Sequence, residues 1–448
     1  MTSKSSPGLG ASMKDKLIQQ ALERRLRQTG DGAPPASLAD VNRGTVVPEQ
    51  FYRFDQHPGY QQLRIMHDGA ARLGLANPFF KLHDSLAGAE TTIQGQRYVN
   101  FASYNYLGYS GHPVVTQAAK AAIDHYGTSV SASRLVSGDR PIHRELEAEL
   151  ARLYEVDDAI TFVSGHATNV TTIGYLFGPR DLVIHDELIH NSVLQGIQLS
   201  GARRLGFPHN DWQALDRLLG EQRQHFERVL VVLEGIYSMD GDYPDLPRFV
   251  ELKNRHKVFL MVDEAHSLGV MGANGKGIRE HFGLAGSDVD IWMGTLSKTL
   301  ASCGGYIAGE SAMVEHLKFM APGFLYSVGM PAPVAAAALA AVRCMARDAE
   351  RVATLQARGQ QFLALAREAG LDTGTSTGLA VIPVITGSSL KATQLSGALA
   401  KRGINAQPIL HPAVPEKSAR VRFFLSCLHT PEQITETVAI VVQELQKL

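Results

Sequence analysis

The chain has only three cysteines among its 448 residues, and they are scattered along it as Cys303, Cys344 and Cys427. An odd, scattered set argues against a disulfide framework and is typical of a reducing compartment, so we expect a cytoplasmic protein. No spacing of cysteines and histidines resembles a metal site, and we predict no metal ligands.

Long apolar runs and an excess of one charge sign are also missing. No run approaches the roughly 20 apolar residues needed to span a bilayer. The opening residues MTSKSSPGLGASMKDK lack the apolar core of a secretory signal. Lys and Arg number 43 and Asp and Glu 44, for a formal net charge of -1. This balance gives no electrostatic reason to expect nucleic acid or an anionic membrane as a partner.

The first 45 residues differ in composition from the rest of the chain. They are rich in Ser, Gly, Pro and Lys except for KDKLIQQALERRLRQ, where apolar residues at helical spacing predict a basic amphipathic helix. Such a helix usually packs on its own fold or on a subunit partner, and docking to another protein or organelle targeting are the alternatives. We expect residues 1–45 to form a tail and residues 46–95 an N-terminal arm.

From about residue 95 the sequence alternates apolar runs, small-residue turns and helical segments. Short runs that are apolar throughout are typical of strands covered on both faces, and they occur at 159–163, 182–184, 229–233, 258–262 and 291–293. Segments with helical periodicity, such as HRELEAELARLYE and DWQALDRLLGEQRQHFERV, lie between several of them. An α/β domain with a mainly parallel sheet is therefore expected, which we place at residues 96–331. Functional groups in such sheets gather at the carboxyl ends of the strands.

A smaller domain is expected after Pro331. The Ala-rich segment AAAALAAVRCMARDAERVATLQARGQQFLALAREAG predicts one long helix. Two strand-like segments follow, at 379–385 and 420–426. These elements predict a small α+β domain at residues 332–448.

The prediction of function rests mainly on two residues, Asp263 and Lys298. Asp263 ends an apolar run in VDEAH, and Lys298 lies in the small-residue turn GTLSKT. A buried carboxylate keeps the ring nitrogen of pyridoxal phosphate protonated, and a lysine forms a Schiff base with its aldehyde and moves protons at a substrate's α-carbon. Alone, such an Asp is usually a helix cap and such a Lys is usually solvated. Together they predict a site for pyridoxal phosphate.

Residues at other strand ends fit around the same cofactor. Gly165 lies in Ser-Gly-His before a helical segment, where backbone N–H groups can seat a phosphate. Asp186 and His190 are four apart in HDELIHNSV, which predicts that they share one helix face. From there the His190 ring could lie flat against the cofactor, although a core histidine is the commoner role of such a residue.

Three more polar residues could contact the cofactor. Ser238 in EGIYSMDGD could donate to its ring oxygen, but serines in such turns more often bond to the backbone. His266, three residues beyond Asp263, could reach the same ring oxygen. Thr295, three residues before Lys298, could offer its hydroxyl to the phosphate.

Taken in order, five motifs resemble the α-oxoamine synthases: SGH, HDELIHNSV, EGIYSMDGD, VDEAHSLGVMG and GTLSKTLASCGGY. This family consists of pyridoxal-phosphate enzymes of fold type I and includes 8-amino-7-oxononanoate synthase, 5-aminolevulinate synthase and serine palmitoyltransferase. The resemblance begins near NFASYNYLGYSGHP and continues to RVRFFLSCLHTPEQI, roughly residues 95 to 448. It implies a large domain with a mainly parallel sheet and a small C-terminal α+β domain.

The resemblance also implies roles for individual residues. The catalytic residues would be Lys298, His190, Asp263 and His266. The remaining cofactor-binding residues near the ring oxygen and the phosphate would be Ser238, Gly165, His166 and Thr295. Family members are homodimers with the site at the subunit interface, so Ser327 in LYSVGMP would serve the neighbour's phosphate. Two residues would bind substrate: Arg422 in ARVRFF would pair with the amino-acid carboxylate, and Asn105 in SYNYLG would lie close by.

The reaction implied by the resemblance is a decarboxylative Claisen condensation of glycine, alanine or serine with an acyl thioester, giving an α-amino ketone. Residues 127–134 read GTSVSASR where smaller family members have a glycine-rich run, and in this the chain resembles synthase domains attached to polyketide assembly lines. An acyl carrier protein is therefore an alternative to coenzyme A as the carrier of the thioester. A fold type I aminotransferase is the alternative enzyme, and a catalytically silent partner subunit is the alternative of another class.

Overall fold

The computed structural model describes residues 47–72, 74 and 76–448. The chain divides into two compact units, Met1–Gly74 and Leu75–Leu448. The described part of the first unit contains two short 3-10 helices, η1 (Glu49–Phe51) and η2 (Phe54–Gln56), followed by helix α2 (Pro58–Arg72). The basic helix expected within the first 45 residues lies outside the described residues.

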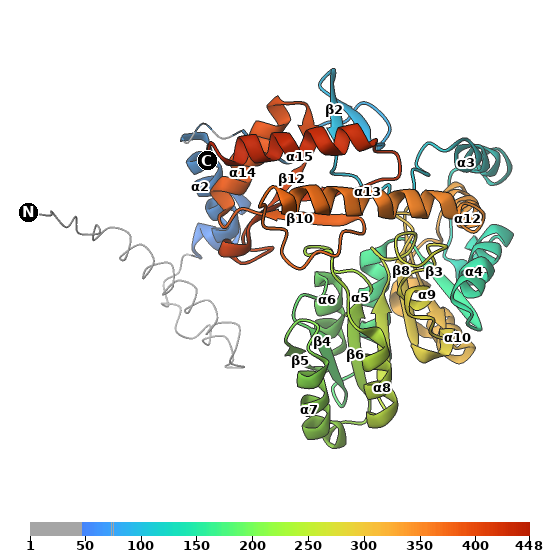
Figure 1. Ribbon diagram of the computed structural model, residues 1–448. Helices are drawn as coiled ribbons and strands as arrows, with labels where there is room; N and C mark the ends of the chain where they lie inside the picture. The colour runs from blue at the N-terminus through green and yellow to red at the C-terminus, as the bar shows by residue number, and fades with distance from the viewer. Residues whose placement is uncertain (1–46, 73, 75) are drawn as a thin grey trace, which may run out of the picture. The chain divides into compact units, whose positions relative to one another are not determined.

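A seven-stranded sheet forms the centre of the second unit (Figure 1). In spatial order its strands are β3 (Asp158–Phe162), β9 (Gly305–Gly309), β8 (Ile291–Thr295), β7 (Phe259–Asp263), β6 (Val229–Glu234), β4 (Leu182–Asp186) and β5 (Arg203–Phe207). Strand β9 is antiparallel to both its neighbours, and the pairs from β8 to β5 are parallel. The predicted fold class is thus confirmed, and each of the five apolar runs forms a strand of this sheet.

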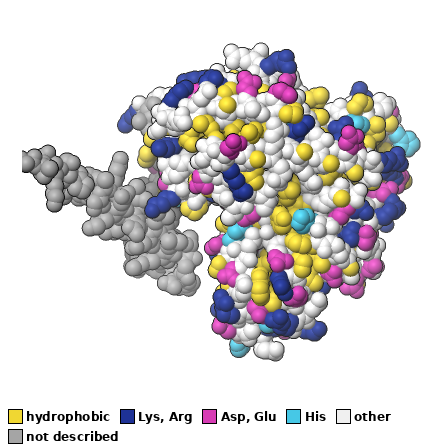
Figure 2. Space-filling model, in the orientation of Figure 1, with side chains coloured by type: hydrophobic (Ala, Val, Ile, Leu, Met, Phe, Trp, Pro, Cys, Tyr) yellow, Lys and Arg dark blue, Asp and Glu magenta, His cyan; other side chains and the backbone are white. Residues whose placement is uncertain are grey.

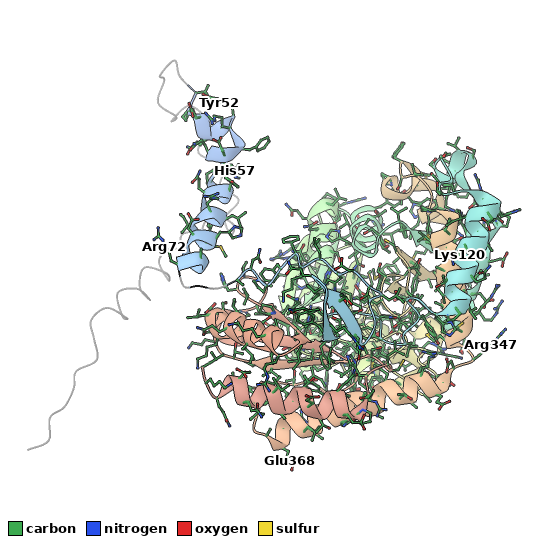
Figure 3. All side chains as sticks on the ribbon, turned by 90° about the horizontal axis from the view of Figure 1, so that it is seen from above. Tyr52, His57, Arg72, Lys120, Arg347 and Glu368 are labelled. Carbon is green, nitrogen blue, oxygen red and sulfur yellow. The ribbon has the colours of Figure 1, made fainter. Side chains whose placement is uncertain are left out.

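Helices cover both faces of the large sheet. Because successive strand residues point to opposite faces, Val232 and Leu233 belong to different apolar clusters. One cluster joins the sheet to α5 (Gly165–Leu176), α6 (Asn191–Ser200), α10 (Ser311–Met320) and α11 (Pro322–Leu325). The other joins it to α4 (Pro141–Tyr154), α7 (Trp212–Gln222), α8 (Leu246–His256), α9 (Ile278–Phe282) and α12 (Ala332–Met345). Helix α3 (Pro113–Tyr126) packs along α12, near the labelled Lys120 and Arg347 in Figure 3.

The C-terminal region contributes to two three-stranded sheets. The first has the order β10 (Val381–Ile385), β13 (Arg420–Phe424), β12 (Gln407–Ile409), and the second joins β1 (Glu90–Ile93) and β2 (Gln96–Asn100) to β11 (Ile404–Asn405). Helices α13 (Ala349–Glu368) and α15 (Pro431–Leu445) pack side by side, and α14 (Ser389–Lys401) packs against α15 (Figure 1). Since β2 pairs with β11, residues 96–100 belong with this region. The domain boundary at 331 stays a prediction.

Two local predictions are wrong. The Ala-rich segment forms two helices, α12 and α13, because the chain turns at Ala346 and Arg347 and Asp348 is not helical. The Asp348 carboxylate accepts a hydrogen bond from Arg351 Nε at 2.7 Å at the start of α13, and apolar periodicity does not register such a break. HDELIHNSV is not one helix either. Asp186 ends β4, its Oδ1 accepts the backbone N–H of Leu188 at 2.9 Å, and His190 is the residue before α6.

The described surface mixes charged residues of both signs. Figure 2 shows Lys and Arg side chains interspersed with Asp and Glu over the face drawn. Across residues 47–72, 74 and 76–448, no helix combines the length and the apolar character needed to cross a bilayer.

Candidate active site

Most of the predicted site residues lie at the edge where the parallel strands of the large sheet end. Asp263 is the last residue of β7 and occupies the position next to Glu234, the last residue of β6. Lys298 follows shortly after the end of β8 at Thr295. The geometry of a parallel sheet therefore brings Asp263 and Lys298 to the same edge, although they are far apart in the sequence.

Lys298 lies in the turn between β8 and β9 and is partly buried. Its Nζ is 5.5 Å from the centre of the Tyr104 ring. Burial lowers the pKa of Lys298 from 10.5 to about 8, against the opposing effect of the Asp263 and Glu234 carboxyl groups. A larger share of this amine is therefore uncharged at neutral pH than for a solvated lysine. Lys298 also lines a cavity of about 390 Å³ together with Tyr104 and Asn105.

Hydrogen bonds fix both carboxylate oxygens of buried Asp263. Oδ1 accepts the backbone N–H of Ala265 at 2.9 Å, and Oδ2 accepts Nδ2–H of Asn169 at 2.9 Å. Asn169 also donates to Ser192 Oγ at 2.9 Å, and Ser192 Oγ lies 2.7 Å from His190 Nδ1. Donors aimed at both oxygens hold the carboxylate in one orientation. The chain of contacts through Asn169 and Ser192 also ties Asp263 to His190.

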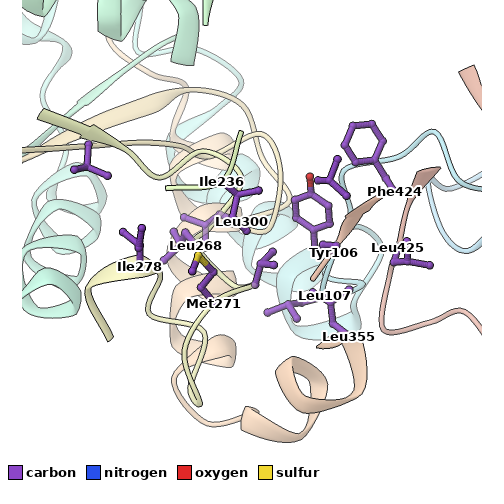
Figure 4. Packing of buried hydrophobic residues seen from close by; sticks show 14 of the residues in the cluster. Tyr106, Leu107, Ile236, Leu268, Met271, Ile278, Leu300, Leu355, Phe424 and Leu425 are labelled. Atoms are coloured by element: carbon purple, nitrogen blue, oxygen red, sulfur yellow. The ribbon is translucent and has the colours of Figure 1, made fainter. Parts of the chain in front are cut away.

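His266 is buried among aromatic rings. Its Nδ1 lies 2.7 Å from the Tyr106 hydroxyl, and its ring lies nearly parallel to that of Phe424 with centroids 6.1 Å apart. Figure 4 shows the Tyr106 and Phe424 side chains at the edge of the apolar core. Burial holds the pKa of His266 well below its usual value, and the positive charges of Lys298 and Arg422 lower it further. His266 is therefore a neutral imidazole.

Arg422 on β13 contacts Ser238, which follows β6. Arg422 on β13 donates from Nη1 to the Ser238 backbone carbonyl at 2.6 Å, and its guanidinium carbon lies 4.4 Å from the Phe424 ring centre. Its Nε is buried and has no hydrogen-bond partner among the described residues. An unpartnered donor in a guanidinium fork is available to a carboxylate ligand.

The turn between β3 and α5 lies directly against Thr295. A Cβ added at Gly165 would be 2.8 Å from Thr295 Oγ1, so only glycine permits this approach. The Thr295 hydroxyl donates to the Gly304 carbonyl at 2.9 Å. His166 and His190 are both exposed, with ring centroids 6.5 Å apart. These residues surround the N-terminus of α5, where backbone N–H groups can bind a phosphate.

Asn105 and Ser327 have different surroundings. Asn105 is buried, and its amide donates to the Ala87 carbonyl at 2.8 Å and accepts from the Ser110 N–H at 3.1 Å. It shares the Lys298 cavity, but these contacts occupy its side chain. Ser327 lies in another pocket, beside Arg134, and its hydroxyl donates to the Val328 carbonyl at 3.3 Å.

Sequence reasoning missed four residues that support the site: Asn169, Ser192, Tyr104 and Tyr106. The two tyrosines flank Asn105 in SYNYLG, and their spacing around a site residue was a signal. Asn169 lies one helical turn after Gly165, on the same face of α5, and gave a weaker signal. Nothing in the sequence singles out Ser192 except its position near the start of a helix.

These side chains fit pyridoxal phosphate. Lys298 provides an amine of lowered pKa for the aldehyde, and Asp263 provides a carboxylate oriented by hydrogen bonds for the ring nitrogen. Gly165 leaves a space that a Cβ would fill beside Thr295, at a helix N-terminus suited to the phosphate. The buried, unpartnered Arg422 Nε is suited to a substrate carboxylate.

The chain is similar to proteins of known family. The model of the aminotransferase class I and II family matches residues 96–441. The 8-amino-7-oxononanoate synthase of Symbiobacterium thermophilum is 40% identical over 372 residues, covering 83% of this chain and 94% of that protein. The 4-hydroxy-2,2'-bipyrrole-5-methanol synthase PigH of Serratia sp. is 36% identical over 353 residues, covering 79% of this chain and 54% of that protein.

Solved structures agree with these sequence matches. The serine palmitoyltransferase of Sphingomonas wittichii superposes with a TM-score of 0.83 at 28% identity, covering 87% of this chain and 98% of that one. The predicted resemblance and the predicted cofactor are thereby confirmed. The chain belongs to the aminotransferase class I and II family and, within it, to the α-oxoamine synthases, and it is a pyridoxal-phosphate-dependent acyltransferase of the decarboxylative condensation type.

Proposed function

We propose that the chain condenses a small α-amino acid, namely glycine, alanine or serine, with an acyl thioester and releases carbon dioxide and a thiol. The product is an α-amino ketone. The observation that carries this proposal is the gathering of Lys298, Asp263 and Arg422 around one site, where Asp263 raises and Arg422 lowers the pKa of the Lys298 amine. This set provides an amine, a carboxylate for the ring nitrogen and a cation for a substrate carboxylate.

Lys298 and Asp263 have complementary roles in the proposal. Pyridoxal phosphate, when bound, supplies a conjugated ring that takes up the electron pair released at a substrate's α-carbon. Lys298 would hold its aldehyde carbon through Nζ and, once displaced by the substrate amine, would remove the α-proton as a general base. Asp263 would accept a hydrogen bond from the protonated ring nitrogen, with the carboxylate oriented by Asn169 and Ala265.

Three further residues position the reactants. His266 would accept the Tyr106 O–H at Nδ1, 2.7 Å away, and present Nε2–H to the ring oxygen. The exposed His190 ring, anchored by Ser192, would stack on the cofactor. Arg422 would hold the amino-acid carboxylate until that group leaves as carbon dioxide. In the condensation, the α-carbon bonds to the acyl carbonyl carbon and the sulfur departs as a thiol.

We also propose that an acyl carrier protein delivers the thioester. The support lies in residues 127–134, where Ser131 has a φ of 54° and Arg134 is buried in ion pairs with Asp139 at 2.8 Å and with Glu147. Residues 128–134 all carry side chains, whereas smaller relatives have a glycine-rich entry for an acyl thioester at this segment. A flexible prosthetic arm needs a narrower entry than a complete coenzyme A.

Thiol release tests the proposed reaction. The protein, loaded with pyridoxal phosphate, is incubated with each amino acid and with the same acyl group on coenzyme A or on a carrier protein. We expect thiol release only when an amino acid and a thioester are both present, and faster release from the carrier protein. Conversion of the cofactor to its aminated form by an amino acid alone would instead identify an aminotransferase. Equal rates from both carriers would remove the carrier-protein proposal only.

We further propose that the chain works as a homodimer in which Ser327 reaches the partner's phosphate. Exposed apolar side chains gather around Arg134: Val136 is 79% exposed, Tyr326 is 87% exposed, and Leu135 and Val328 are each 54% exposed. The segments that carry them are joined by a hydrogen bond from Gly329 N–H to the Ala132 carbonyl at 3.0 Å. An exposed apolar patch of this kind is typical of a protein interface.

Sedimentation velocity tests the dimer. Tyr326→Glu should convert the protein from two chains to one, because a charge would be buried in the interface. Leu390→Glu on α14, where Leu390 is 44% exposed, is a control outside this patch and should stay dimeric. A single-chain mass for the unmodified protein would contradict the proposal.

A further inference from the structure

Glu234 is a buried carboxyl group that has no role in the mechanism above. It is the last residue of β6, it is 4% exposed, and it pairs in register with Asp263 of β7. Residues in register on neighbouring parallel strands point to the same face of the sheet. The site therefore contains two carboxyl groups side by side, and buried carboxyl groups at such close quarters do not both ionise readily.

The hydrogen bonds of the two carboxyl groups differ. Asp263 has a donor on each oxygen, from Asn169 and from Ala265. Glu234 Oε1, in contrast, is buried and has no hydrogen-bond partner within the described part of the chain. An ionised carboxylate with a buried, unpartnered oxygen is costly, whereas a neutral acid loses much less on burial. The proton of the pair therefore belongs on Glu234.

The surrounding charges favour the same assignment. Burial raises the pKa of Glu234 well above its usual value, and the negative charges of Asp263 on β7 and Asp186 on β4 raise it further. Lys298 and the His190 backbone N–H act in the opposite direction, each with a smaller effect on the pKa of Glu234 than burial or Asp263. Tyr237, which is close in the loop after β6, has a pKa well above its usual value and stays uncharged.

We propose that Glu234 is a neutral carboxylic acid that holds the proton of the Glu234–Asp263 pair, so that only one negative charge lies beside Lys298. An ionised Glu234 would favour the charged ammonium form of Lys298. As a neutral acid, Glu234 leaves Asp263 ionised for the ring nitrogen and leaves Lys298 more readily uncharged. Glu234 is thus a positioning residue, and its purpose rests on the proposed roles of Lys298 and Asp263.

Infrared difference spectroscopy tests the protonation state directly. A protonated carboxyl group has a carbonyl stretch that an ionised carboxylate lacks. The spectrum of the protein minus that of Glu234→Gln at pH 7 should contain this band, with and without added pyridoxal phosphate. Subtraction of Glu315→Gln, an exposed glutamate on α10, should give no such band. Glu264, whose buried side chain has its pKa raised to about 7, is present in all three proteins and cancels. No band at Glu234 would overturn the proposal.

A pH titration of the bound cofactor's visible absorbance tests the consequence for Lys298. Glu234→Gln replaces a neutral acid by a neutral amide, so its midpoint should stay within about half a pH unit of the unmodified protein. A midpoint lowered by roughly one unit or more would show that Glu234 carried a negative charge, and would overturn the proposal. If Glu234→Gln does not fold, as judged by circular dichroism, Glu234→Met serves the same infrared subtraction. Because that measurement does not need the cofactor, a failure of the proposed function would leave the result for Glu234 valid.

Discussion

The contact between Tyr106 and His266 shows how a single hydroxyl can prepare a site. The 2.7 Å contact holds the imidazole ring in one orientation, and burial keeps it neutral. A neutral imidazole has one N–H, so we propose that the Tyr106 O–H donates to Nδ1 and that Nε2–H is the donor toward the site.

Tyr106→Phe should test this orientation. The substitution removes one buried hydrogen bond, and we expect the free energy of unfolding to fall by about 1 kcal/mol. We expect kcat for thiol release to fall more than KM rises, because His266 loses its fixed orientation while the substrate contacts remain. Urea denaturation and steady-state kinetics measure the two effects. Tyr52→Phe, at an exposed position of the first unit, is the control and should change neither. An unchanged kcat in Tyr106→Phe would show that this hydrogen bond does not prepare His266.

At the scale of elements, the turn between β3 and α5 and the turn after β8 form one contact. Gly165 is the first residue of α5 and Thr295 the last of β8, and they approach so closely that a Cβ added at Gly165 would lie 2.8 Å from Thr295 Oγ1. The contact places the N-terminus of α5 next to the segment that carries Lys298.

Gly165→Val should therefore weaken cofactor retention more than it weakens the fold. The added side chain would collide with Thr295 and push the α5 N-terminus away from the phosphate. We expect the dissociation constant for pyridoxal phosphate to rise at least about tenfold, which equals 1.4 kcal/mol. Equilibrium dialysis measures it. Gly220→Val on α7, where a Cβ meets nothing, is the matched control and should leave cofactor binding unchanged. Unchanged retention in Gly165→Val would contradict the phosphate seat.

The sequence was most informative about elements buried on both faces. The runs that became β3, β4, β6, β7 and β8 are apolar because helices cover both faces of the sheet, so composition alone predicts them. Strand β9 has the sequence GYIAG, and its small residues form no apolar run from which a strand could be predicted. Strand β11 has only two residues, which is too short to show a pattern. The break between α12 and α13 depends on a local contact of Asp348, and the spacing of apolar residues does not predict that contact.

The candidate site was only partly predictable for a related physical reason. Asp263, His266 and Lys298 follow strand ends, where the topology itself brings residues together. Asn169 and Ser192 act through other side chains, Asn169 on Asp263 and Ser192 on His190, and such contacts depend on how α5 and α6 pack. Asn105 shares the Lys298 cavity, but its use in bonds to Ala87 and Ser110 became visible only in three dimensions.

At the scale of the whole molecule, His209 makes the free energy of unfolding fall as the pH becomes alkaline. Burial alone would lower its pKa, but contacts with Asp186 at 2.9 Å and Asp242 at 3.0 Å raise it to about 10. The ordinary value in an unfolded chain is about 6.5. The stabilisation from charged His209 is therefore fully present below pH 6.5 and is lost as pH rises through 10.

His209→Gln should lower the free energy of unfolding by about 4 kcal/mol at pH 6 to 7. The gap to the unmodified protein should shrink progressively as the pH approaches 10. Urea denaturation at several pH values measures the gap, and a constant gap would contradict the assignment.

His429 provides a contrast of opposite sign. Burial lowers its pKa to about 4, so its contribution is present above pH 6.5 and is lost as pH falls through 4.

Bond formation between Lys298 and pyridoxal phosphate is the most direct test of the account as a whole. The protein is saturated with pyridoxal phosphate, treated with borohydride, digested, and mapped by mass spectrometry. The account predicts the added mass of the reduced cofactor on the peptide that contains Lys298, and no added mass on the matching peptide of Lys298→Ala. A modification confined to another lysine, or no modification of the saturated protein, would contradict it.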